Sequence, residues 1–152
     1  IKLNVRSFDT EVRKRVLAAT ERIAYAEAEA SGAPQPPEFA ILNRYPLGYS
    51  DPAASERVAN VFRRHFSADR VQQVGPTSAS EDFGAFGAQW EAPAVFWFFG
   101  GTDPDQYAAA KAAGELSMLP TNHSPYFAPV IHPTLQTGVE AMVVAALPWL
   151  AE

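Results

Sequence analysis

The 152-residue chain contains no cysteine, which excludes disulfide bonds, a thiolate nucleophile and thiolate metal ligands. Positive charge is also scarce, since 12 lysines and arginines stand against 17 aspartates and glutamates. Because phosphate binding needs clustered positive charge, this balance argues against a nucleic-acid partner. The apolar run at residues 94–99 is far shorter than the roughly 20 residues that span a bilayer. With no signal peptide in view, we expect no membrane partner and a cytoplasmic location.

The remaining composition is typical of a folded domain, with 47% hydrophobic and 19% charged residues. Alternating apolar and polar residues predict a strand at residues 1–8, and further strands are predicted at 38–45 and 71–74. Residues 94–99, Ala-Val-Phe-Trp-Phe-Phe, predict a buried strand. We therefore expect an α/β fold with mixed sheets and flanking helices.

Helices are predicted from apolar spacing and from residues that favour helix ends. A stripe with spacings of three and four predicts a helix that begins after Asp9 or Thr10 and ends near Gly32. Asp51 and Pro52 suit the start of a helix that runs to about residue 66. Its apolar residues fall on one side, namely Ala54, Val58, Val61, Phe62 and Phe66. A short helix is expected to follow residues 77–83 and to run through about residue 86, and another is expected over 104–114. A last helix is expected from residue 133 onward, with an apolar face made of Leu135, Val139, Met142, Val143, Ala146 and Leu150.

A break in these patterns at residues 46–52, Pro-Leu-Gly-Tyr-Ser-Asp-Pro, predicts a boundary between two lobes. We expect residues 1–47 to form a β-α-β lobe and residues 48–152 to belong to an α/β domain. Because Ile1 stands inside an alternating pattern, we also expect the chain to be a piece of a longer protein.

His123 is the first candidate metal ligand. It lies in the polar loop at residues 119–125, downstream of the predicted strand that stops at Gly100 and Gly101. Enzymes of the α/β class present ligands and catalytic bases in loops beside the end of a strand. A hydrogen-bonded surface histidine is the competing interpretation.

The other histidines do not complete a metal site around His123. His65 follows the apolar face of its predicted helix and is expected to pack there, and His132 is expected to cap a turn or a helix start. A zinc or manganese site needs three or four ligands. The residues of this chain therefore predict only part of a site.

Two further pairs of polar residues are candidates for substrate binding or site support. Glu81 and Asp82 precede a short predicted helix, where carboxylates ordinarily satisfy amide groups and the helix dipole. Asn4 and Arg6 share one face of the strand predicted at residues 1–8, and an amide beside a guanidinium suits a substrate carboxylate. An ordinary helix start and an exposed sheet face are the simpler interpretations.

Four motifs follow one another in the second half of the chain. They are Ser-Glu-Asp-Phe at 80–83, the apolar run that ends at 100–101, Asn-His-Ser-Pro-Tyr-Phe at 122–127, and a last helix that contains Gly138. Their order resembles the C-terminal part of the aminoacylase, hippurate hydrolase and carboxypeptidase G family of metal-dependent amidohydrolases. The closest branch is the one that includes hippurate and auxin-conjugate hydrolases. The resemblance covers nearly all of residues 80–150.

The first residues extend the resemblance, and one later position departs from it. Residues 4–9, Asn-Val-Arg-Ser-Phe-Asp, are similar to a strand of the family's lid domain. Residues 131–133 read Ile-His-Pro, whereas the family usually has an acidic residue near the start of the last helix.

The resemblance implies a two-domain enzyme. An α/β catalytic domain would hold two divalent metal ions (zinc, manganese or cobalt), and an α+β lid would form a homodimer. The histidine that matches His123 is a metal ligand in this family. Glu81 and Asp82 would support the site, and Gly100 and Gly101 would lie near the substrate. The other ligands and the general-base glutamate would come from segments that precede the lid, so no catalytic base is expected in this chain.

The implied reaction is hydrolysis of the amide bond of an N-acyl amino acid or a similar small conjugate. Two metal ions would lower the pKa of a bridging water that attacks the carbonyl. Asn4 and Arg6 would hold the substrate carboxylate. The chain by itself is expected to be inactive and to bind zinc weakly. The alternative is a catalytically inert fragment, or an interaction or dimerisation module without activity of its own.

Overall fold

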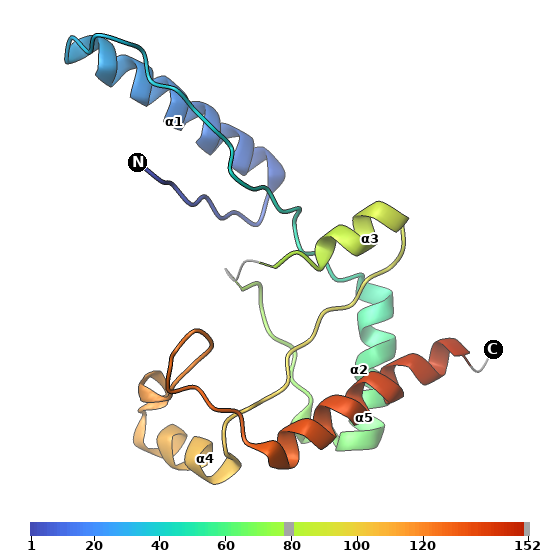
Figure 1. Cartoon of the computed structure of the whole chain (residues 1–152). Helices are drawn as coiled ribbons and strands as arrows, with labels where there is room; N and C mark the ends of the chain where they lie inside the picture. The colour runs from blue at the N-terminus through green and yellow to red at the C-terminus, as the bar shows by residue number, and fades with distance from the viewer. Residues whose placement is uncertain (78–80, 151–152) are drawn as a thin grey trace. The chain divides into compact units, whose positions relative to one another are not determined.

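The computed structural model describes residues 1–77 and 81–150. Over these residues it contains helices and connecting segments but no β-strand (Figure 1). The predicted α/β fold with mixed sheets is therefore wrong, and the described part of the chain is all-α. The chain divides into two compact units: Ile1–Ser55 with Gln72–Phe96, and Glu56–Val71 with Trp97–Glu152.

The segments predicted as strands have no regular secondary structure. Alternation of apolar and polar residues sets which side chains share a face, but a strand also needs a neighbour whose amides and carbonyls pair with its own. The described residues supply no such neighbour. The four corrected segments are residues 1–8, 38–45, 71–74 and 94–99.

Residues 94–99 were expected to be buried, and this prediction is also wrong. Phe96, Phe98 and Phe99 are all exposed. In place of a ladder, the Asp51 amide donates to the carbonyl of Ala94 (2.8 Å), and the Phe96 amide donates to a serine hydroxyl, Ser50 Oγ (3.0 Å). Single hydrogen bonds of this kind hold the segment without building a sheet.

Helix α1 (Thr10–Ala30) begins and ends as its sequence predicts. The Asp9 carboxylate accepts the Val12 amide at 2.8 Å, and Gly32 adopts φ 64° just beyond the C-cap Ser31. None of its residues is buried. The segment after α1 returns along the helix (Figure 1), where Arg13 Nη1 donates to the Tyr45 carbonyl at 2.9 Å.

Helix α3 (Gly84–Trp90) completes the first unit. Gly84 is buried, and a Cβ at this position would lie 2.7 Å from the carbonyl oxygen of Leu47. Only glycine allows so close a backbone approach without displacement. The ring of Phe83, just before the helix, packs near those of Phe86 and Phe96.

Helix α2 (Pro52–Phe66) contributes most of the buried apolar side chains. Its predicted start is confirmed, because Asp51 Oδ1 accepts the Ala54 amide at 2.8 Å. Its predicted apolar side is also confirmed, since Val58, Val61 and Phe62 are buried. Phe62 meets the ring of Trp97 edge-on, with centroids 5.4 Å apart.

The second unit also contains η1 (Ala68–Arg70), α4 (Pro104–Ala113), η2 (Leu116–Met118) and α5 (Ile131–Leu150). In α5, Ala141 and Ala145 are buried. Leu135, Val139 and Met142, on the side of this helix that the sequence predicts to be apolar, are exposed. No helix in the described residues is long and apolar enough to cross a membrane.

Candidate functional site

His123 is presented to solvent by two successive turns. The Ser124 amide donates to the Thr121 carbonyl at 3.0 Å, and the Phe127 amide donates to the Ser124 carbonyl at 3.1 Å. Ser124 Oγ also accepts the Tyr126 amide at 3.2 Å. The first bond closes a turn that contains His123, and the other two fix the backbone that follows it, while the His123 side chain stays exposed.

The backbone of His123 adopts φ 73°, in the left-handed region. Few residues other than glycine take up this conformation, and such positions concentrate at ligand sites and tight turns. The surrounding turn bonds provide the constraint that the conformation requires.

Gly100 and Gly101 contact the segment that leaves the His123 loop. The Val130 amide donates to the Gly101 carbonyl at 2.9 Å, and Thr134 Oγ1 lies 3.4 Å from the Gly100 carbonyl. A Cβ on Gly101 would lie 3.2 Å from Pro129 Cβ, whereas one on Gly100 would meet nothing within 4 Å. The structure thus brings the diglycine to the C-terminal end of the His123 loop.

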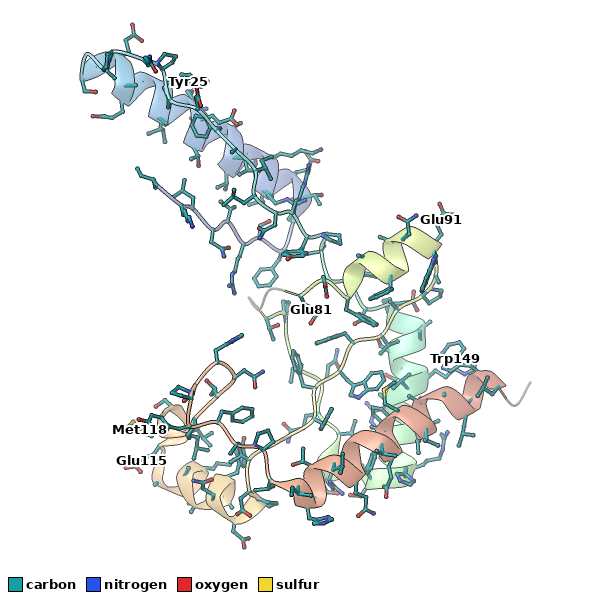
Figure 2. All side chains as sticks on the ribbon, in the orientation of Figure 1. Tyr25, Glu81, Glu91, Glu115, Met118 and Trp149 are labelled. Atoms are coloured by element: carbon teal, nitrogen blue, oxygen red, sulfur yellow. The ribbon has the colours of Figure 1, made fainter. Side chains whose placement is uncertain are left out.

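Glu81 and Asp82 belong to the first unit, in the segment that leads into α3 (Figure 2). Glu81 Oε1 accepts the amides of Asp82 at 2.7 Å and Phe83 at 2.8 Å. These bonds, the one from Phe83 first, lower the pKa of the Glu81 carboxyl below its usual value. Glu81 therefore satisfies amides before a helix, as the simpler interpretation held. Ser80, in the same motif, lies outside the described residues.

Asn4 and Arg6 are exposed in the segment that precedes α1. Their expected placement on one face of a strand does not hold, because residues 1–8 form no strand. They lie in the first unit, as Glu81 and Asp82 do, whereas His123, Gly100 and Gly101 lie in the second.

The described residues do not assemble a metal centre. Within 1–77 and 81–150, no group of three or more histidines, aspartates and glutamates is close enough to hold an ion. Divalent metal sites in proteins ordinarily need at least three protein ligands. Among the described residues His123 is thus a single exposed donor, and the sequence resemblance places the other ligands in segments that precede the lid.

Glu140 is a partner of His65 that the sequence patterns did not single out. Its Oε2 lies 2.8 Å from His65 Nε2. The available signal was the composition of α5, in which Glu140 is the only aspartate, glutamate, lysine or arginine. A lone charge in an otherwise apolar helix needs a polar partner or solvent, but its partner is 75 residues away in the sequence.

A comparison with models of known protein families finds no family that matches the chain.

Proposed function

We propose that this chain is the C-terminal part of a cytoplasmic, metal-dependent amidohydrolase that cleaves the amide bond of N-acyl amino acids or similar small conjugates. His123 would be its one metal ligand in this chain. The observation that carries the proposal is the presentation of His123, an exposed imidazole on a left-handed backbone inside a hydrogen-bonded turn. The order of the sequence motifs around it adds support.

In this proposal the chain positions the His123 imidazole, and hydrogen bonds of its own residues hold the His123 loop in place. The Gly101–Val130 hydrogen bond fixes the exit of the loop, and the Ser124 bonds fix its turn. A neutral imidazole held in this way is a suitable ligand for zinc, manganese or cobalt. The remaining ligands and the catalytic base would come from elsewhere in the longer protein, so this chain alone would not hydrolyse the substrate.

The test is replacement of His123 by alanine in the longer protein. We expect bound metal, measured by elemental analysis, and turnover of an N-acyl amino acid to fall together by at least about 10-fold, because a metal site that loses one ligand loses affinity and activity. His132→Gln is the matched control, since it removes a second exposed histidine of the same unit. Full metal content and full turnover in His123→Ala would contradict the proposal.

A specific observation favours a second candidate, an interaction or dimerisation module. Helix α1 buries none of its residues, and Val12, Val16 and Ile23, which share one side of the helix at spacings of four and seven, are 38%, 39% and 63% exposed. Exposed apolar side chains in a row along a helix mark surfaces that associate. If α1 mediates self-association, light scattering will show a dimer for the chain and a monomer for Ile23→Glu. Glu21→Gln, an exposed change on the same helix, should leave the dimer intact, and a wild-type monomer would exclude this candidate.

A further inference from the structure

Helix α5 leaves a continuous stripe of apolar residues exposed. On its covered side, Ala141 and Ala145 are buried, and a Cβ on Gly138 would lie 3.0 Å from the ring of Phe99. The stripe lies on a different side of the helix. Its six exposed residues are Leu135, Val139, Met142, Val143, Ala146 and Leu150.

The larger side chains of the stripe are more than half exposed. Leu135 and Met142 are each 64% exposed, and Leu150 is 77% exposed. Leu147 and Trp149, which are also exposed, flank the stripe on its two sides. Single apolar residues are ordinary on protein surfaces, but a contiguous group of them marks a surface that binds a partner.

No charged side chain of α5 lies in the stripe. Glu140 is the only aspartate, glutamate, lysine or arginine in this helix. Its carboxylate accepts Gln136 Nε2 at 2.7 Å and lies 2.8 Å from His65 Nε2, on α2. Two copies of the stripe can therefore face each other without the repulsion between like charges that opposes association.

The spacing of the stripe is the same in both directions along the helix. Successive residues are four, three, one, three and four positions apart, so the pattern is symmetric about a midpoint between Met142 and Val143. In a twofold dimer, each contact from residue i to residue j is matched by the contact from j to i. Antiparallel helices that meet at this midpoint form the pairs Leu135 with Leu150, Val139 with Ala146, and Met142 with Val143.

Orientation and size also fit a second copy of the chain. Antiparallel packing brings the positive end of each helix dipole near the negative end of the other. Covering the stripe on both copies would bury on the order of 1,000 Å², which is the lower limit for a specific protein interface. We therefore expect a dimer that dissociates in the micromolar range.

We propose that two copies of this chain associate through the exposed stripe of α5, with the helices antiparallel about a twofold axis beside Met142 and Val143. The symmetric spacing is the reason for choosing a second copy, because a partner of another kind would not require it. This interface uses neither α1 nor the His123 loop.

Sedimentation velocity of the 152-residue chain at concentrations from about 5 to 500 µM tests the association. The wild-type chain should change from monomer to dimer across this range. Met142→Glu places two like charges at the centre of the interface and should weaken the dimer by at least about 10-fold. Its monomer should stay folded, as circular dichroism will show, because Met142 is exposed.

Two control variants make the result specific to the α5 stripe. Met142→Leu keeps an apolar side chain of similar volume and should dimerise as the wild-type chain does. Ile23→Glu places the same new charge on α1, where Ile23 is exposed, and should leave the α5 dimer intact.

Single introduced cysteines test the antiparallel arrangement, because the chain has no cysteine of its own. Met142→Cys lies beside the twofold axis and should form a disulfide with its copy, since the two Cα atoms can approach to within about 7 Å. Leu135→Cys should not, because its position lies opposite Leu150. The two introduced cysteines would then be 15 positions apart along the helices, or about 22 Å.

Three results would overturn the proposal. A wild-type monomer at every concentration would leave another partner, such as a segment of the longer protein, as the cover of α5. A dimer that persists in Met142→Glu would exclude the stripe, and its loss in Ile23→Glu would assign the association to α1. Equal disulfide formation by Met142→Cys and Leu135→Cys would contradict the antiparallel pairing.

Discussion

Helices α1 and α2 begin with the same device, an aspartate side chain that accepts the amide of the residue three positions ahead. Both carry apolar residues at helical spacing. Yet α1 has no buried residue, whereas α2 buries Val58, Val61 and Phe62. Capping and spacing therefore determine that a helix forms. Whether its apolar face stabilises the fold depends on what other segments of the chain bring against it.

The largest expected effect comes from comparing one apolar side chain on each helix. Phe62→Ala should lower the free energy of unfolding by about 3 kcal/mol, because it removes a buried ring that packs against Trp97. Ile23→Ala on α1 should change it by less than about 0.5 kcal/mol, since Ile23 is mostly exposed. Urea denaturation followed by circular dichroism measures both. Equal losses would show that α1 is covered in solution.

A smaller effect is expected at the diglycine, which offers a crowded and an open position side by side. Gly101→Ala should destabilise the second unit by about 1 kcal/mol, because the new Cβ would press on Pro129 and Phe127. Gly100→Ala meets nothing within 4 Å and should be neutral or slightly stabilising through loss of unfolded-state entropy. The same denaturation experiment compares them, and a larger loss for Gly100→Ala would contradict the described packing.

Removing the N-caps of α1 and α2 should affect different quantities, the local stability of one helix and the global stability of the chain. Asp51→Ala and Asp9→Ala each remove a cap worth about 1 kcal/mol to its helix. For Asp51 we expect the loss in the unfolding free energy of the chain, because α2 carries buried residues. For Asp9 we expect faster amide hydrogen exchange in α1 and little change in global unfolding. A matching global loss for both variants would remove the distinction between the helices.

The smallest expected effect is the titration of Glu81. The amides of Phe83 and Asp82 lower the pKa of this carboxyl in the folded chain. The contribution of ionised Glu81 to stability is therefore present above the unfolded-state pKa and is lost as the pH falls through the lower folded-state pKa. The carboxyl carbon of Glu81, followed by NMR, should titrate below the range of ordinary glutamates. The Phe83 amide resonance should move with it, and in Glu81→Gln that movement should disappear. A titration midpoint in the ordinary range of glutamates would mean that the Glu81 carboxylate does not accept hydrogen bonds from these amides.

The helices were predictable from the sequence because their signals are local. Asp9, Asp51 and Gly32 act within a few residues of the helix ends that they define. The sheet was not predictable, because strand pairing depends on partners distant in sequence. For the same reason, spacing identifies the apolar side of α5 that includes Val139 but not the residues that other segments cover, which are Ala141 and Ala145.

The candidate site was predictable only in part. The exposed loop position of His123 follows from its polar and proline-rich neighbours. The contact between Gly101 and Val130 depends on how the chain folds back after η2, which no local pattern specifies. The His65–Glu140 pair likewise joins residues from separate helices.

The measurement that tests the central claim most directly is a calorimetric zinc titration of the 152-residue chain and its His123→Ala variant. One exposed imidazole without companion ligands should bind weakly, with a dissociation constant of about 0.1 mM or higher, because tight zinc sites use three or four protein ligands. This binding should weaken further in His123→Ala. Tight binding of two ions, or binding that is unchanged by His123→Ala, would contradict the account of His123 as one ligand of a site completed elsewhere.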